Sequence, residues 1–372
     1  MKTFFNLIQE VQKPGLCHRC GGCVTFCNAV NFGALDLDED GVPRYAEIEK
    51  CIECGLCYAI CPEIAELEEE TRRLVSWSAP VGRVMETHVA RAGHSEIRDR
   101  GTDGGVVTAL LMHLMDTGRI DGAVVTRPID MFQREPILAQ DKEDILESAG
   151  FYADTSPGMK NFSDRYLTYT TVEELGPVMR RGLRRVAFVG TPCQIKAIRK
   201  MQAMRIVPSE SIAFCLGLFC SGNFVFGDRQ KEKLAELGGF SWDDVRKINI
   251  KDALQVHLTG GDIRTIPLNQ LDFMRREACR FCPDYASEYA DLSFGGLGAG
   301  EGWTTVLART PMGRAALTEA MESSAVEKGD RREGHSPSQA FEQILDWSRR
   351  KKQLAEESRS QLGKPSVRFR TV

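Results

Sequence analysis

Apolar residues are concentrated in short runs along the chain, and polar turns that contain glycine separate these runs. Residues 122–126, 185–190 and 211–219 are each apolar over almost their whole length, which is typical of buried strands. Residues 106–117 have apolar side chains at helical spacing, and Gly118 follows as a typical helix stop. Strands that alternate with helices in this way predict an α/β domain with a mixed central sheet.

Two segments add to this pattern. Residues 245–251 and 253–259 resemble an antiparallel pair, so we expect further β structure around 245–267. The C-terminal segment 338–372 begins as an amphipathic helix, becomes strongly charged and ends in a strand-like run. It is interpreted either as a free, solvated helix or as an arm that docks a partner.

Length and charge restrict the function classes. A chain of 372 residues is long enough for two or three domains. The net charge of −4 argues against a general nucleic-acid binder, which would be basic. No window approaches the roughly 20 apolar residues of a membrane span, and the N-terminus does not resemble a signal peptide. We therefore expect a cytoplasmic protein without a membrane span.

The chain has thirteen cysteines, and in a reducing compartment clustered thiols indicate metal or redox chemistry. Two runs have the spacing C-x2-C-x2-C-x3-C; they contain Cys17, Cys20, Cys23 and Cys27, and Cys51, Cys54, Cys57 and Cys61. Pro62 completes the second run, whereas Asn28 stands at the corresponding position of the first. This is the pattern of bacterial ferredoxins that hold two [4Fe–4S] clusters.

In that pattern each run gives three ligands to its own cluster and the fourth ligand to the other cluster. We therefore expect one cluster on Cys17, Cys20, Cys23 and Cys61, and the other on Cys51, Cys54, Cys57 and Cys27. A structural zinc site is the alternative, but zinc sites usually space two ligand pairs farther apart. Two clusters side by side would make residues 12–64 a one-electron pathway, which needs a donor and an acceptor.

Five cysteines lie outside these runs. Cys193 and Cys220 each follow an apolar strand, at the end where α/β sheets carry their sites, and Cys279 and Cys282 form a C-x2-C pair. Cys215 lies inside an apolar strand and is expected to be a core residue. The other four are interpreted either as small buried side chains or as the ligands of a third cluster. A nucleophilic Cys193 is a further alternative, although no histidine lies near it in the motif.

A glycine-rich turn, "GTDGG" at residues 101–105, precedes the predicted helix at 106–117. Free backbone N–H groups at a helix N-terminus, together with the helix dipole, favour a bound phosphate or another anion. The turn does not have the G-x-G-x-x-G spacing of a standard dinucleotide site, and glycine also serves simply to bend the chain. Phosphate or flavin binding and a plain turn are therefore both compatible with this segment.

Several segments together resemble one known family. "GTDGGVVTALL", "VAFVGTPCQI", "LGLFCSGNF" and "ACRFCPDYASEYADLSFGG" are similar, in this order, to the beta subunits of coenzyme F420 hydrogenases and dehydrogenases, and the resemblance covers residues 12–315. It implies FAD in the α/β domain and a third [4Fe–4S] cluster held by Cys193, Cys220, Cys279 and Cys282. The implied flavin contacts are Thr102, Gly104, Gly105, Thr108, Gly295, Gly296 and Gly298. For the last three, a plain glycine turn is the alternative.

The same resemblance implies a redox chemistry. F420 carries hydrides and iron–sulfur clusters carry single electrons, so a flavin between them would convert one into the other. A basic pocket is expected for the phosphate and glutamates of F420, and the candidates are Arg127, Arg134, Lys160 and Arg165. Each of these is otherwise a solvated surface charge.

The implied partner is another redox subunit, such as a hydrogenase, a formate dehydrogenase, a heterodisulfide-reductase-like protein or a quinone-reducing module. Two other functions fit the same motifs: a flavin and iron–sulfur reductase of a different organic substrate, and a pure electron-transfer adaptor.

The predicted fold class is α+β and α/β: a dicluster ferredoxin-like module at residues 1–66 is followed by an α/β flavin-binding domain with a mixed central sheet at 85–325. Residues 67–84 are expected to be a linker, and residues 326–372 a charged helical tail.

Overall fold

The computed structural model describes residues 1–29, 32–128, 134–150, 183–206, 209–330 and 335–362. Its N-terminal module comprises α1 (Phe4–Leu7), a π-helix (Ile8–Gln12), α2 (Gly22–Ala29), the antiparallel strands β1 (Leu35–Leu37) and β2 (Pro43–Tyr45), and α3 (Leu56–Ala59). Cys27 and Cys57 are buried in the core of this module together with Phe4, Val24 and Tyr58. Because the elements are short, the cysteines make up a substantial part of the buried interior.

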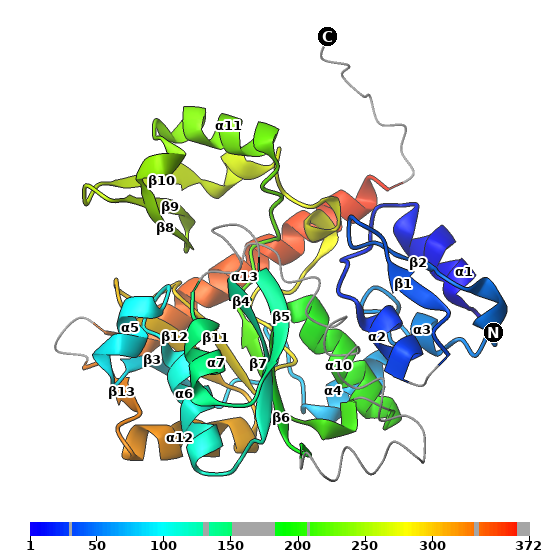
Figure 1. The fold of residues 1–372 in the computed structure, drawn as a ribbon, viewed down its shortest axis with the longest axis horizontal. Helices are drawn as coiled ribbons and strands as arrows, with labels where there is room; N and C mark the ends of the chain where they lie inside the picture. The colour runs from blue at the N-terminus through cyan, green and yellow to red at the C-terminus, as the bar shows by residue number, and fades with distance from the viewer. Residues whose placement is uncertain (30–31, 129–133, 151–182, 207–208, 331–334, 363–372) are drawn as a thin grey trace.

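An eight-stranded mixed sheet forms the centre of the rest of the chain, in the order β13-β3-β12-β11-β7-β6-β4-β5 (Figure 1). The strands are β3 (Glu86–Ala92), β4 (Gly122–Pro128), β5 (Arg134–Ala139), β6 (Val186–Gly190), β7 (Ile212–Leu218), β11 (Leu292–Gly295), β12 (Thr304–Ala308) and β13 (Val326–Lys328). Strands β11, β7, β6 and β4 pair in parallel, and the other pairs are antiparallel. The predicted strands at 122–126, 185–190 and 211–219 correspond to β4, β6 and β7, and the mixed sheet is confirmed.

Each face of the sheet buries its own layer of side chains. The layer on one face includes α5 (Ser95–Arg100), α6 (Val106–Asp116), α7 (Lys142–Glu147) and α12 (Pro311–Glu322), which bury Ile97, Leu110, Ile145 and Leu317. The layer on the other face includes α10 (Pro192–Met204), which buries Ile195 and Met201. Parallel strands covered on both faces are apolar along their whole length, which explains the short apolar runs of the sequence.

The N-terminal module packs directly against α10. Phe26 of α2 and Ile60, which follows α3, belong to the same buried cluster as the inner side of α10. Lys200 of α10 is fully buried, and its Nζ donates to Cys61 O at 2.7 Å and to Ile64 O at 2.5 Å. These contacts hold the ferredoxin-like module in one position on the α/β domain.

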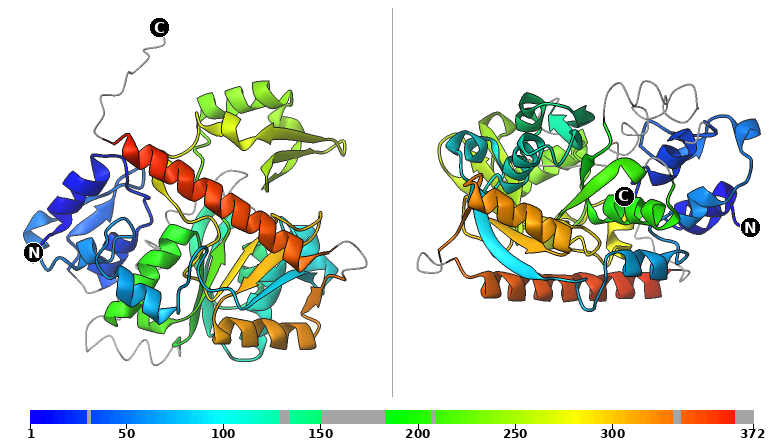
Figure 2. Two further views of the ribbon diagram at one scale, coloured as in Figure 1. Left: turned by 180° about the vertical axis from the view of Figure 1, so that it is seen from behind. Right: turned by 90° about the horizontal axis from the view of Figure 1, so that it is seen from below.

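The expected linker at 67–84 and the expected C-terminal tail both contain helices that pack against the α/β domain. In the segment 67–84, α4 (Glu68–Leu74) lies against α10. The tail forms α13 (Pro337–Ser360), which runs along the back of the molecule (Figure 2). Its inward side chains are buried: Ala340, Ile344, Ser348 and Ala355. A partner-docking role for α13 stays a prediction, and only the exposed side of this helix could contact a partner. The expected strand-like run at 366–372 lies outside the described residues.

A small subdomain follows β7 in the chain. It contains α11 (Asp228–Gly238) and a three-stranded antiparallel sheet of β8 (Val245–Ile250), β9 (Ala253–Leu258) and β10 (Ile263–Pro267). The expected antiparallel pair is therefore confirmed, and the subdomain buries its own apolar cluster. Among the described residues, no helix is both long and apolar enough to cross a membrane.

Candidate functional site

A cavity of about 180 Å³ lies at the carboxyl ends of the parallel strands. Thr191 follows β6, Phe219 and Cys220 follow β7, and Gly295 and Gly296 lie at the end of β11; all of these residues line the cavity. In α/β sheets with this topology, ligands bind at the carboxyl ends of the strands. The sheet therefore forms a candidate ligand site where the sequence had placed its glycine-rich and cysteine-containing turns.

The glycine-rich turn 101–105 forms one wall of this cavity. Gly105 is the N-terminal cap of α6 and has a φ of 70°, a conformation that favours glycine. Gly104 lies behind the turn, where its N–H donates to Thr304 Oγ1 at 3.0 Å and an added Cβ would lie 2.8 Å from Ala90 O. Thr102 Oγ1 is buried without a hydrogen-bond partner among the described residues. A buried hydroxyl beside a helix N-terminus fits a polar, anionic ligand such as a flavin nucleotide.

The expected flavin contacts fall into two groups. Thr102, Gly105, Thr108, Gly295 and Gly296 line the cavity, whereas Gly104 and Gly298 are not among its lining residues. Gly298 has a φ of 79° and packs against α13, where an added Cβ would lie 2.6 Å from the Cα of Ala340. Glycine at position 298 is thus required by a close approach of two backbones, independently of any ligand.

Of the four expected basic residues, only Arg127 and Arg134 belong to the described part of the chain, and neither is among the residues that line the cavity. Arg127 lies 3.9 Å from the Glu147 carboxylate near the surface, and Lys160 and Arg165 lie outside the described residues. Arg134 donates to the backbone oxygens of Thr126 at 2.9 Å and Ser148 at 2.7 Å. Since Ser148 lines the cavity, this guanidinium supports the cavity rim.

Strand β8 brings other basic groups to the glycine-rich turn. Lys247 Nζ lies 3.5 Å from Gly101 O, Asn249 Nδ2 donates to Asp103 Oδ1 at 2.9 Å, and Lys251 Nζ lies 3.4 Å from the same oxygen. Residues 247, 249 and 251 share one face because side chains alternate along a strand. Burial lowers the pKa of Lys247. Sequence analysis missed these residues, although the alternation within "VRKINIK" was visible.

The eight N-terminal cysteines surround two small cavities. One is lined by Cys17, Cys20, Cys23 and Cys61, and the other by Cys27, Cys51, Cys54 and Cys57. The fold thus brings together the same two sets that the spacing predicts, while iron ligation itself stays a prediction. Within the described part of the chain, no three His, Cys, Asp or Glu residues are grouped as ligands of a single metal ion. The four thiolates of a cubane cluster each bind a different iron, so they surround a volume and do not converge on one point.

A third set of cysteines is assembled from three distant segments. Cys193 is the second residue of α10, Cys220 follows β7, and Cys279 and Cys282 lie in and directly after the 3-10 helix Glu277–Phe281. Cys193 interacts electrostatically with Cys220 and Cys282, and Cys220 interacts with Cys279. Burial raises the pKa of Cys220 to about 12, so its thiol is neutral unless a cationic centre such as iron is bound.

Cys215 is fully buried within β7, as expected for a core residue. The third set contains the four remaining cysteines outside the ferredoxin-like runs. Cys220 lines the main cavity as well, so the third set adjoins the candidate ligand site directly.

The three sets follow one another through the molecule. Cys193 of the third set interacts electrostatically with Cys20 of the first set, and Cys23 of the first set interacts with Cys57 of the second. The order is therefore the cavity, the third set, the first set and finally the second set.

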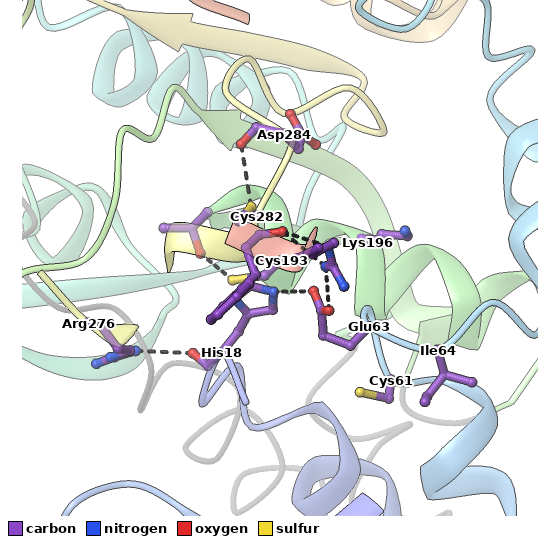
Figure 3. A network of polar contacts seen from close by, with 12 residues as sticks. His18, Cys61, Glu63, Ile64, Cys193, Lys196, Arg276, Cys282 and Asp284 are labelled. Carbon is purple, nitrogen blue, oxygen red and sulfur yellow. Dashed lines mark hydrogen bonds and ion pairs between the residues drawn. The ribbon is translucent and has the colours of Figure 1, made fainter. Parts of the chain in front are cut away.

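Two buried polar side chains occupy the junction between the first and third sets (Figure 3). His18 Nε2 lies 2.6 Å from Glu63 Oε1, and the Arg276 guanidinium donates to His18 O at 3.1 Å. Burial opposes the charged form of His18, but its contacts with Cys279 and Glu63 outweigh burial and raise its pKa to about 9. Burial likewise opposes the charged form of Glu63, yet His18 and Arg359 lower its pKa to about 2. The junction is thus an ion pair inside the protein.

Comparison with known proteins defines the class: a component of an oxidoreductase complex that carries a 4Fe-4S dicluster domain ahead of an α/β domain. Residues 9–62 match the model of the 4Fe-4S dicluster domain. Residues 87–162 and 183–333 match the two models of the coenzyme F420 hydrogenase/dehydrogenase beta subunit, for its N-terminal part and its C terminus. The chain belongs to this beta-subunit family and is an oxidoreductase component.

Named relatives and a solved structure agree with this assignment. The chain is 30% identical over 254 residues to the coenzyme F420 hydrogenase beta subunit of Methanococcus voltae, covering 67% of this chain and 85% of the relative. It is 28% identical over 322 residues to the coenzyme F420-dependent sulfite reductase of Methanocaldococcus jannaschii, covering 82% of this chain but only 46% of that protein. A chain of the F420-reducing [NiFe] hydrogenase complex from Methanosarcina barkeri superimposes with a TM-score of 0.65 at 27% identity, covering 77% of this chain and 94% of that chain.

Proposed function

We propose that this chain exchanges a hydride between coenzyme F420 and FAD and passes single electrons through three [4Fe–4S] clusters to a partner oxidoreductase subunit. The observation that carries the proposal is the continuity of the site: Cys220 lines the main cavity and belongs to the third set of cysteines. An α/β domain that served only for docking would have no reason to join a ligand cavity to a set of thiols.

The residues of the cavity fit a flavin nucleotide. The N–H groups at the start of α6 would bind polar atoms of the nucleotide, as would the Thr102 hydroxyl, which has no hydrogen-bond partner within the described part of the chain. Gly105 would permit a close approach of its backbone. Val125 and Phe294 supply apolar walls that exclude water from the ring. When bound, FAD supplies the chemistry that joins two-electron hydride transfer to one-electron transfer.

Lys247 of β8 and Lys251, which directly follows this strand, are the basic groups best placed for an anionic part of either ligand. Lys251 lines the cavity, and Lys247 reaches the backbone of the glycine-rich turn. Both lie near Asp103: Lys251 Nζ is 3.4 Å from its carboxylate, and Asn249 donates to the same oxygen. The two lysines and this one carboxylate together carry one net positive charge, which an anionic ligand can meet. We therefore assign to Lys247 and Lys251 the phosphate-binding role that the sequence had suggested for Arg127, Arg134, Lys160 and Arg165.

The second set of cysteines is the proposed exit for electrons. Ile48 and Ile52, on either side of Cys51, are 63% and 62% exposed. Large apolar side chains exposed next to a predicted cluster are suited to contact with a redox partner. The relatives named above as hydrogenase subunits belong to complexes with other redox subunits, which supports a partner at this end.

The proposal is tested by mixing the anaerobic holoprotein with reduced F420 and following the deazaflavin absorbance together with cluster bleaching. Rapid reoxidation of F420 with bleaching is the expected result. Bound flavin with no response to reduced F420 would favour a reductase of a different organic substrate. A preparation without flavin would favour an electron-transfer adaptor. The matched variants are Lys251→Met, expected to raise the KM for F420, and Arg127→Met, expected to leave it unchanged.

A further inference from the structure

A lysine of the C-terminal helix reaches the third set of cysteines. Lys351 lies in the middle of α13, and its Nζ donates to Cys220 O at 2.6 Å and to Asp284 O at 2.9 Å. Cys220 is a member of the third set, and Asp284 follows Cys282 by two residues. The lysine therefore joins two of the three segments that form this set.

The ammonium group is also close to the thiols themselves. Lys351 interacts electrostatically with the sulfur groups of Cys282, Cys220 and Cys279, and with the Asp284 carboxylate. It is half-buried, so its charge is screened less than that of a surface lysine. On another side of the set, His18 contacts Cys279, but it is already paired with Glu63. Lys351 is a cation directed at the end of the set that adjoins the main cavity.

The position of Lys351 is fixed by contacts elsewhere along α13. Towards its N-terminus, Ala340 packs against Gly298 and Ile344 is fully buried. Towards its C-terminus, Arg359 Nη2 donates to Glu63 Oε2 at 2.6 Å and to Phe281 O at 2.9 Å. Because α13 is held on both sides of Lys351, the backbone at this position is fixed relative to the set, and the two hydrogen bonds to Cys220 O and Asp284 O direct the ammonium towards it.

We propose that Lys351 raises the reduction potential of the third cluster and so makes that cluster the first acceptor of electrons from the cavity. This inference rests on the proposed function, because it requires iron on the third set of cysteines. Reduction adds one negative charge to a cluster, and a fixed cation nearby stabilises that charge. At an effective dielectric constant of about 20 and a separation of several ångströms, one unit charge changes the reduction equilibrium by about tenfold or more.

The test is a potentiometric titration of the anaerobic holoprotein, followed by electron paramagnetic resonance. Lys351→Gln removes the charge but keeps an N–H donor for the carbonyl of Cys220. We expect its third cluster to be harder to reduce by about tenfold, or about 59 mV for one electron. Lys351→Arg keeps the charge and is expected to restore the potential.

Lys352→Met is the matched control on the same helix. Lys352 Nζ pairs with Glu288 at 2.7 Å and is not directed at the thiols. The two N-terminal clusters should keep their potentials in every variant, and all three clusters should keep theirs in Lys352→Met.

The outcomes separate this inference from the function on which it rests. A wild-type protein with only two clusters would refute the third cluster itself. Three clusters whose potentials do not change in Lys351→Gln would overturn the inference and leave the proposed function intact. Loss of the third cluster from Lys351→Gln, with the N-terminal clusters retained, would also overturn it, since the lysine would then be structural.

Discussion

Arg309 offers the most direct test of what holds the loop that carries Cys279 and Cys282 in place. It follows β12, only 1% of it is exposed, and its guanidinium donates to Val81 O at 2.7 Å, Ala286 O at 2.8 Å and Ser293 Oγ at 2.5 Å. Ala286 lies between Cys282 and β11. One side chain therefore connects the loop that carries the cysteine pair to the segment that precedes β3.

The expected cost of Arg309→Met follows from these contacts. Met has similar length but no donor, so the backbone oxygens of Val81 and Ala286 and the hydroxyl of Ser293 would lose a charged partner inside the protein. Each buried acceptor left without a donor costs about 1–3 kcal/mol, which for three acceptors gives a loss of roughly 3–9 kcal/mol for the variant. Since folded domains are stable by only about 5–15 kcal/mol, this loss is a large fraction of the total.

The assay is anaerobic urea denaturation of the holoprotein, followed by circular dichroism. Arg314→Met is the control, because the Arg314 side chain is 47% exposed and lies 3.8 Å from Glu86. Exposed pairs contribute about 0–1 kcal/mol, so the control should unfold close to the wild type. If Arg309→Met unfolds at the same urea concentration as Arg314→Met, the structural role assigned to the buried guanidinium is wrong.

Further predictions address the cofactors. Cys193→Ser should reduce the iron content from about twelve to about eight per chain and prevent electron transfer from flavin to the N-terminal clusters; normal transfer would contradict the third cluster. Gly105→Val should lose flavin but keep iron, whereas Gly118→Val, with a similar φ of 63° but open space around it, should keep both; equal loss of flavin would argue against the cavity as the flavin site. Removal of iron by a chelator should increase amide hydrogen exchange in the N-terminal module much more than in β6 and β7, because that module has short elements and a core containing cysteines; a uniform increase would contradict this reasoning.

Features that depend on neighbours in the sequence could be predicted. The two four-cysteine sets follow from spacing, because a C-x2-C-x2-C run can close around one cluster almost without help from the rest of the chain. The strands at Val186–Gly190 and Ile212–Leu218 are short and apolar because both faces of the sheet are covered, and this composition is visible locally.

Features that depend on distant contacts could not be predicted in the same way. The proximity of Cys193, Cys220 and the pair at 279 and 282 depends on the order of β6, β7 and β11 in the sheet, which a single sequence does not specify. The same reason explains why Lys351 was seen only as part of a charged tail. The residues around Lys351 would be the same whether its side chain were exposed on the surface or directed at a set of cysteines.

The sequence likewise did not indicate which basic residues lie at the cavity. Arg134 is close to the cavity, but its donors are used by backbone oxygens of the rim, whereas Lys251 comes from a separate subdomain. Composition identifies a charge, and only the packing of β8 over the glycine-rich turn determines which charge faces a ligand.

The central claim is that one chain joins a flavin site to three iron–sulfur clusters. The measurement that tests it most directly is the iron, sulfide and flavin content of the anaerobically purified chain, together with its Mössbauer spectrum. The account predicts about twelve irons, all in [4Fe–4S] clusters, and one FAD per chain. About eight irons and no flavin would contradict it, because the cavity and the third set of cysteines would then have no redox role.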